Sequence, residues 1–269
     1  MKKKKNSSDL MTFGGHLEVL RQIIFRILVV GGIVSIAVFC FKDATWNMLL
    51  APSEWDFATY RWIERMAQAM DVENFHFSEF HVKLIATDLS SQFMTHLTTS
   101  IYLGLLITSP YILYELFRFV SPALFENERK YSVKTIVAVY CLFIVGMLIS
   151  YYMLFPISFR FLGTYSVSER VESTITLDSY VSTFVTLVLL MGVVFQLPVI
   201  SFLLSKMGVV DAYMLSKYRK HAFLVILTVA AIITPGQDIL SLSLVSLPLY
   251  LLYELSILVV RRYGNKKNC

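Results

Sequence analysis

Long apolar blocks alternate with shorter polar stretches along this chain, and the blocks set its architecture. An α-helix of roughly 20 apolar residues, rising about 1.5 Å per residue, crosses the hydrocarbon core of a bilayer. The pattern predicts six membrane-spanning helices: Ile23–Phe41, Leu97–Leu116, Thr135–Phe155, Tyr180–Leu204, Ala222–Ile233 and Ile239–Val260. The fifth is short for a crossing, which local thinning of the bilayer can accommodate. A re-entrant hairpin formed by the last two segments remains an alternative.

The predicted external loop, residues 42–93, carries a second kind of periodicity. Trp55, Ala58, Trp62, Met66 and Met70 recur at helical spacing, which is typical of an amphipathic helix in the membrane interface. Tryptophan is enriched at that depth. We therefore expect an anchoring helix along the outer face, or alternatively a wall that shields a groove between spans.

Prolines interrupt three of the predicted spans. Pro110, Pro198 and Pro248 lie in spans two, four and six, and each removes one backbone hydrogen bond and bends its helix. A single such proline is often merely tolerated in a membrane helix. Three together predict a concave face instead of a close-packed bundle.

Composition and charge support this architecture and orient it. The chain of 269 residues is 56% apolar and 16% charged, with a mean hydropathy of +0.63, whereas soluble domains are about 25% charged. It is therefore predicted to be an all-α polytopic membrane protein. One side holds 17 Lys and Arg side chains: Lys2 to Lys5, Arg21, Arg118, Arg129, Lys130, Lys134, Lys206, Lys217, Arg219, Lys220, Arg261, Arg262, Lys266 and Lys267.

The opposite loops hold only six cations in longer stretches. Because Lys and Arg stay in the cytoplasm, both termini are predicted to be cytoplasmic. The expected organisation is a cytoplasmic segment (residues 1–22), a six-helix membrane domain (23–260) and a cytoplasmic tail (261–269). The first apolar run is longer than that of a secretory signal peptide, so we expect it to be retained as a helix.

Four polar side chains are predicted at or near membrane depth, where an ionised group is costly and is usually turned toward protein or water. Each could contact a partner protein. Glu115 and Glu254 could instead pair with nearby cations such as Arg118 and Arg261, and the uncharged amide could bond an adjacent helix. The four are Glu115, Gln196, Asp238 and Glu254.

The segment from Ser109 to Tyr131 is more specified than a plain connector requires. It combines two prolines and three carboxylates with neighbouring cations between two apolar spans. We interpret it as a recognition surface at the cytoplasmic face. Ser121 and Pro122 alternatively favour a helix start, with the following carboxylates at the positive end of its dipole.

Catalytic and cofactor motifs are absent from the sequence. It contains no phosphate-binding G-x-x-x-x-G-K-[ST] loop, no H-E-x-x-H zinc motif and no G-x-S-x-G elbow. Cys40, Cys141 and Cys269 lack metal or disulfide spacing. We therefore expect neither an enzyme nor a metal, cofactor or nucleic acid.

The order of motifs resembles the TatC family, the multispanning receptor subunit of the Sec-independent twin-arginine protein translocase. The segment from His16 to Arg21 resembles the family's His-Leu-x-Glu-Leu-Arg signature. Three further resemblances follow in order along the chain. Residues 114–131 resemble the family's first cytoplasmic loop, and residues 195–198 resemble its Phe-Glu-x-Pro element. Its last hairpin is resembled by Thr234-Pro235, Asp238, residues 248–250 and residues 252–254. The resemblance covers nearly the whole chain.

The resemblance implies recognition of twin-arginine signal peptides at the cytoplasmic face. Glu128 matches the family's signal-contacting Glu and Phe119 its loop aromatic, while Glu18 and Arg21 belong to the N-terminal signature. Glu126 is added on chemistry alone, because a guanidinium pair is best met by carboxylates that accept bidentate bonds.

Three positions depart from the family pattern. The Glu before Leu-Arg is replaced by Val19, which leaves Glu18 about 100° around the helix. The intramembrane Glu is replaced by Gln196, which bonds but does not ionise. The turn before Asp238 carries one extra residue.

The resemblance also implies the surroundings. They are a bacterial cytoplasmic (inner) membrane, single-span partners of the TatA and TatB type, a homo-oligomer within a larger complex, and energy from the proton-motive force. The competing interpretation is a secondary transporter of a small solute, which generally has internal repeats. Neither a repeat nor a central charge pair is visible in the sequence.

Overall fold

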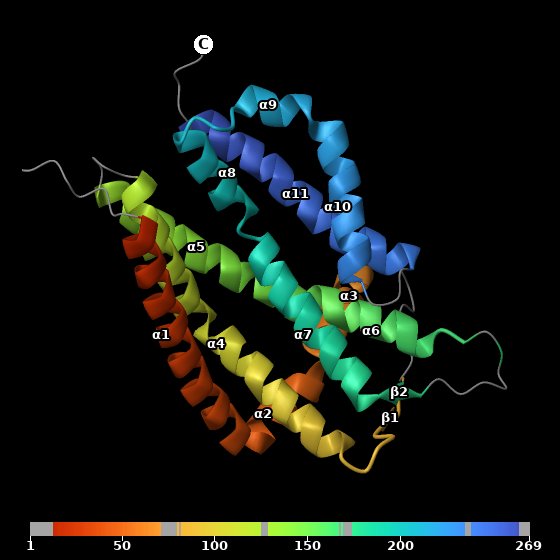
Figure 1. Cartoon of the computed structure of the whole chain (residues 1–269). Coiled ribbons are helices and arrows are strands. Elements are labelled where there is room, and N and C mark those ends of the chain that lie inside the picture. Colours follow the sequence, from red (N-terminus) through yellow and green to blue (C-terminus); the bar gives the residue numbers. More distant parts are fainter. Residues whose placement is uncertain are drawn as a thin grey trace, which may run out of the picture.

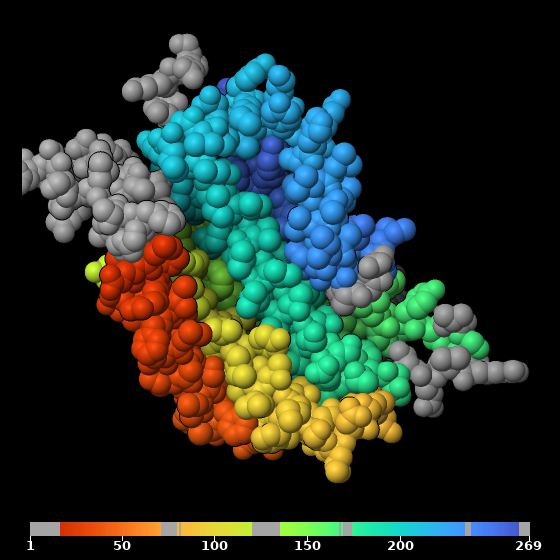
Figure 2. All heavy atoms as spheres, viewed as in Figure 1, coloured from red at the N-terminus to blue at the C-terminus, as the bar shows by residue number. Residues whose placement is uncertain are grey.

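The computed structural model describes residues 13–70, 80, 82–124, 129–166, 168, 174–234 and 238–263, and nearly all of them are helical. The helices pack side by side into a bundle, shown as ribbons in Figure 1 and with all heavy atoms in Figure 2. The start of α1 and the end of α11 lie on the same side of it, as the predicted topology requires. The elements are α1 (Phe13–Cys40), α2 (Lys42–Leu50), η1 (Ala51–Ser53), α3 (Ala58–Ala69), β1 (Leu84–Ile85), α4 (Ser91–Leu124), α5 (Arg129–Ile149), η2 (Ser150–Leu154), α6 (Phe155–Thr164), β2 (Ile175–Thr176), α7 (Leu177–Val194), α8 (Leu197–Lys206), α9 (Ala212–Lys217), α10 (Arg219–Ile233) and α11 (Ile239–Tyr263).

The described helices include five segments long and apolar enough to cross a membrane. These are Leu17–Cys40, Ser91–Phe119, Thr135–Thr164, Leu177–Lys206 and Ile239–Tyr263. One further apolar helix, α10, has 15 residues. Its length is about 22 Å at 1.5 Å per residue, which is shorter than a hydrocarbon core of about 30 Å. The short fifth helix expected from the sequence is therefore present, packed against α11.

The third span is longer than its apolar pattern predicts. It continues past Phe155 as α6 to Thr164, because a π-helical turn from Ser150 to Leu154 joins α5 to α6. Pro156 lies just after this π-turn, and its missing N–H removes one hydrogen bond from the continuing helix. The predicted end at Phe155 was wrong because the helix continues through the turn.

The three predicted proline bends differ in form. Pro110 and Pro248 lie within the continuous helices α4 and α11. Pro198 lies in the first turn of α8, after α7 has ended at Val194. The fourth span is therefore broken into two helices at Phe195 and Gln196. Helix α4 also continues through Ser121 and Pro122 to Leu124, so the alternative of a helix start there was wrong.

An aromatic cluster forms the core of the outer half. The ring of Tyr180 meets Phe155 and Phe159 edge-on, with centroids 5.1 Å apart in each pair. Its hydroxyl donates to the carbonyl of Leu49 at 2.8 Å, which fixes α7 to the end of α2. These contacts seat the external segments on the bundle.

Helix α3 is the predicted amphipathic helix. Trp62 and Met66 face outward, 59% and 38% exposed, while Tyr60 on the opposite face is buried and donates to the carbonyl of Pro156 at 2.8 Å. Burial raises the pKa of Tyr60, so the hydroxyl keeps the proton that it donates. The apolar face of α3 is thus presented outward, as expected for an interfacial helix.

The external layer also contains elements that the sequence pattern did not predict. Helix α2 follows α1 after a single residue, and β1 pairs with β2 in parallel, with Leu84 opposite Ile175. The strand pair joins the loop before α4 to the loop before α7. It closes the outer end of the bundle beside α6.

Candidate functional site

The start of α1 and the end of α4 lie side by side, on the side predicted to be cytoplasmic, and carry predicted recognition residues (Figure 1). The two helices are antiparallel and are joined by an ion pair between Arg26 and Glu115, with 3.8 Å between Nη1 and Oε1. Arg21 lies five residues from Arg26 toward the start of α1, and Phe119 lies four residues from Glu115 toward the end of α4, which is the same direction in space. At about 1.5 Å per residue, Arg21 and Phe119 are at the same level, with Glu18 one turn beyond.

Glu115 is the buried member of this group. Its side chain is 5% exposed, and it accepts a hydrogen bond from the Tyr111 hydroxyl at 2.9 Å in addition to its pairing with Arg26. The alternative that Glu115 pairs with a cation is confirmed. The cation is Arg26 on α1, however, and not Arg118. The pair therefore fastens the two recognition helices to each other.

The exposed surface of α1 beside this pair is cationic. Arg21, Gln22, Phe25 and Arg26 line a shallow pocket of about 490 Å³. Two guanidinium groups here would repel the arginines of a signal. Glu18, which is exposed, is the acceptor that α1 offers.

The other two predicted acceptors, Glu126 and Glu128, lie outside the described residues, which end at Leu124 and resume at Arg129. Their assignment stays a prediction. The described neighbour from the same segment is Phe119, which is half-buried near the end of α4.

A groove of about 490 Å³ opens between α4, α5, α7 and α8 and supplies the predicted concave face. Its walls include Ser109 and Ile112, which flank Pro110, and Gln196 and Val199, which flank Pro198, whereas no described residue of α11, which holds Pro248, lines it. Almost all of its walls are apolar, with Ser109 and Gln196 as the polar members. The lining residues are Leu105, Leu106, Ser109, Ile112, Leu113, Leu116, Phe117, Val139, Phe143, Leu189, Val193, Gln196, Val199, Ile200 and Leu203.

Gln196 is the polar residue of the groove at membrane depth. It is 7% exposed, and its Nε2 donates to the carbonyl of Val139 on α5 at 3.2 Å. Its buried Oε1 accepts no hydrogen bond from the residues that the structure describes. The amide therefore bridges two helices and still offers one acceptor.

Glu254 forms a polar cluster near the C-terminal end of α11. Its carboxylate pairs with Arg219 of α10 at 2.9 Å and accepts from the Tyr250 hydroxyl at 3.2 Å. The hydroxyl of Tyr253 donates to the carbonyl of Leu215 in α9 at 2.7 Å. The cation is again on a neighbouring helix and is not the Arg261 considered from the sequence.

Asp238 begins α11 at the outer end. Its Oδ2 accepts from the backbone N–H of Ser241 at 2.7 Å, which satisfies one of the free donors of the first turn. This capping hydrogen bond is sufficient to explain why a carboxylate is present at this position. A role for Asp238 in contact with a partner stays a prediction.

Comparison with known proteins decides the family. A family model described as Sec-independent protein translocase protein (TatC) matches residues 15–248. The chain belongs to the TatC family.

Relatives match the chain over most of its length. The TatC protein of Blattabacterium sp. subsp. Periplaneta americana (strain BPLAN) is 33% identical over 266 residues, which cover 98% of this chain and 100% of the relative. That of Escherichia coli (strain K12) is 33% identical over 183 residues, covering 68% of this chain and 70% of the relative. A crystal structure of the twin arginine translocase receptor TatC superposes with a TM-score of 0.73 at 26% identity, covering 92% of this chain and 99% of that one.

The TatC family assignment settles the class of protein. It is a multi-pass membrane component of a protein translocase and not an enzyme. The small-solute transporter considered from the sequence is not favoured by these matches. Among the described residues, no group of three His, Cys, Asp or Glu side chains could hold a metal ion.

Two cations in this TatC protein were missed from the sequence. Arg26 was overlooked as the partner of Glu115, and Arg219 as the partner of Glu254. A signal for Arg26 was present, because it is the one charged residue inside the first predicted apolar run. A charge in a membrane helix usually has a partner on another helix.

Proposed function

We propose that this chain is the receptor component of a twin-arginine translocase, binding twin-arginine signal peptides at the cytoplasmic face so that folded proteins are exported. The observation that carries the proposal is the superposition on a twin-arginine translocase receptor over 92% of the chain. The cationic side of the bundle, with both described chain ends, would face the cytoplasm of a bacterial inner membrane. Arg21, Arg261 and Arg262 all lie at that side.

Recognition would begin where α1 and α4 meet. A pair of guanidinium groups offers two rigid donor forks, which carboxylates meet with bidentate bonds. Glu18 on α1 and Glu126 and Glu128 after α4 are the acceptors that we assign, with Phe119 as an aromatic face for the peptide. Arg21 and Arg26 would repel the arginines of the peptide from their own part of α1 and so favour binding at these carboxylates.

The apolar part of the signal would then enter the groove between α4, α5, α7 and α8. Its walls are apolar, and burial of apolar peptide surface stabilises such a complex. The free Oε1 of Gln196 would accept a hydrogen bond from a peptide or partner group at membrane depth. Glu254, Glu115 and Asp238 are further polar positions for partner contact.

The bundle itself does not contain a passage for a folded protein, because the described cavities have volumes of only hundreds of Å³. We therefore assign the passage to partner subunits of the single-span TatA and TatB type, assembled with several copies of this chain. The proton-motive force would supply the energy, since the sequence contains no phosphate-binding loop.

A photocrosslinking experiment tests the recognition site. Probes at Phe119 and Glu128, in the full chain in native membranes, should label a signal peptide that carries Arg-Arg much more than its Lys-Lys twin. The reason is that ammonium groups cannot form the bidentate bonds. A probe at Tyr213, which is 78% exposed on α9, is the control and should label neither. Equal labelling of the two peptides at Phe119 would contradict the receptor assignment.

The role of Gln196 is tested separately. Gln196→Leu should reduce co-purification of single-span partners about fivefold, because a polar contact between membrane helices contributes about 1 kcal/mol. Gln196→Glu keeps an acceptor at the same position and is the matched variant, which should retain the partners. Unchanged recovery with Leu would show that this amide serves only the contact with Val139.

A further inference from the structure

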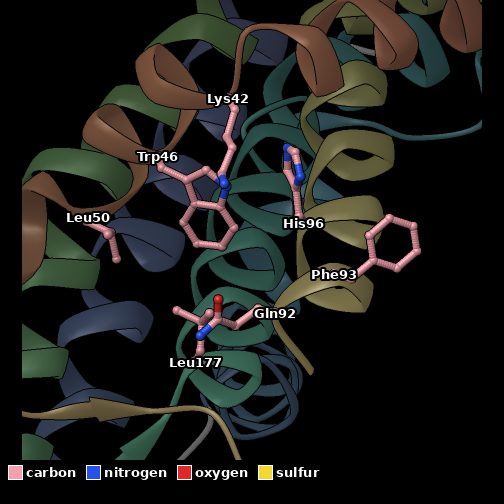
Figure 3. Close-up of a pocket in the computed structure, with 7 residues that line it drawn as sticks. All are labelled: Lys42, Trp46, Leu50, Gln92, Phe93, His96 and Leu177. Carbon is pink, nitrogen blue, oxygen red and sulfur yellow. The ribbon is translucent and has the colours of Figure 1, made fainter. Parts of the chain in front are cut away.

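A second pocket lies at the outer end of the bundle, away from the recognition face (Figure 3). It has a volume of about 430 Å³ and lies where α2, α4 and α7 begin. Its lining residues are Lys42, Trp46, Leu50, Gln92, Phe93, His96 and Leu177. Neither the family motifs nor the groove account for it.

Two buried ring nitrogens meet at this pocket. His96 is 8% exposed, its ring stacks on Phe39 with centroids 4.3 Å apart, and its Nε2 has no hydrogen-bond partner among the described residues. Nε1 of Trp46 also has no hydrogen-bond partner among the described residues, and the centroid of the Trp46 ring is 6.2 Å from that of His96. A buried donor without an acceptor is costly. The pair therefore calls for a ligand that accepts hydrogen bonds.

The remaining polar groups indicate that this ligand is negatively charged. Figure 3 shows Lys42 above the Trp46 and His96 rings, with the amide of Gln92 below them. None of the described residues that line the pocket is acidic. Lys42, Trp46 and His96 as the Nε2–H tautomer are all donors. The N-terminal ends of α4 and α7 add positive potential at the same place. The arrangement fits an anion with several acceptor oxygens.

The position of the pocket favours a lipid as the source of that anion. The first apolar segment ends at Cys40 and the second begins at Ser91, so the pocket is at the depth of the outer headgroups. Phe93 lines it and is followed along α4 by exposed Leu97 and Ile101. These side chains are one turn apart on one face and offer a strip for an acyl chain. Leu50 and Leu177 complete an apolar floor.

We infer that this pocket binds the phosphate of an anionic phospholipid headgroup from the outer leaflet, held by Lys42, the Trp46 indole and His96. A phosphodiester presents acceptor oxygens and one negative charge to these three donors. The inference does not depend on signal-peptide binding, because it concerns the opposite face of the bundle.

Native mass spectrometry of the purified full chain in detergent tests the inference, with phosphatidylglycerol and phosphatidylcholine as the probes. Phosphatidylglycerol should bind about tenfold more tightly. Lys42→Gln should weaken the binding of phosphatidylglycerol about tenfold, as expected for the loss of one charge-assisted hydrogen bond. Trp46→Phe keeps the ring and removes only the N–H, and should weaken binding severalfold. Thermal unfolding of each variant verifies that it is folded.

Lys83→Gln is the matched control, since it removes an exposed cation from the same face outside the pocket. It should leave the affinity unchanged. Equal binding of the two lipids, or equal losses from Lys42→Gln and Lys83→Gln, would overturn the inference. Displacement of phosphatidylglycerol by inorganic phosphate at low millimolar concentration would assign the pocket to a free anion and overturn the lipid.

Discussion

Tyr180→Ala is expected to destabilise the protein by about 3–5 kcal/mol, which is the range for the loss of a large buried ring. Tyr180 is 2% exposed and joins the aromatic core of α6 and α7 to the end of α2. Its removal leaves a cavity beside Phe155 and Phe159 and an unpaired carbonyl at Leu49. Thermal unfolding in detergent, followed by circular dichroism, should show a Tm lower by roughly 10 °C.

Two companion variants separate the causes. Tyr180→Phe keeps the ring and loses only the hydrogen bond to Leu49, so it should cost about 1 kcal/mol. Tyr213→Ala removes a tyrosine that is 78% exposed and should leave Tm nearly unchanged. If Tyr180→Phe were as unstable as Tyr180→Ala, the hydrogen bond and not the packing would hold the outer half together.

Gly104→Ile is expected to separate α1 from α4. A Cβ at Gly104 would lie 2.7 Å from the Cα of Ser35, which is backbone and cannot rotate away. Overpacking of this kind costs about 1–3 kcal/mol, so Tm should fall by roughly 5 °C. Because α1 packs mainly on α4, crosslinking between cysteines at Arg21 and Phe119 should fall as well.

Gly32→Ile is the matched control for this change. Gly32 is on α1, the helix that packs against Gly104 of α4, but it is exposed and has nothing within 4 Å of its Cβ position. The same side chain there should alter neither Tm nor the crosslink. An equal effect of the two variants would point to a general consequence of replacing a helical glycine and away from close packing between α1 and α4.

Much of the fold follows from hydrophobic runs, because a membrane helix must satisfy its backbone internally and bury apolar surface in lipid. That rule predicts the existence and order of the spans, and the interfacial pattern predicts the outward-facing Trp62 of α3. It does not predict irregular backbone within a span. The π-turn from Ser150 to Leu154 and the break at Gln196 depend on neighbouring helices, as do the paired strands at Leu84 and Ile175.

The candidate site shows the same division. Glu115 and Glu254 were identified from the sequence because charge is rare in apolar segments. Their cations, Arg26 and Arg219, are 89 and 35 positions away along the chain. Such pairings are set by which helices pack together. A lone charge such as Arg26 in an apolar run indicates that a partner exists, but the sequence does not say which residue it is. The outer pocket was missed for the same reason, because Lys42, Trp46 and His96 meet only after α2 folds against α4.

The break in the fourth span separates two helices that have different main neighbours. Helix α7 packs against α5, whereas α8 packs against α11. Rotation about Phe195 and Gln196 would therefore carry α8 with α11 and leave α5 and α7 in contact. The groove is bounded by both α7 and α8, so these two residues form the joint at which it would widen when a long apolar segment is inserted.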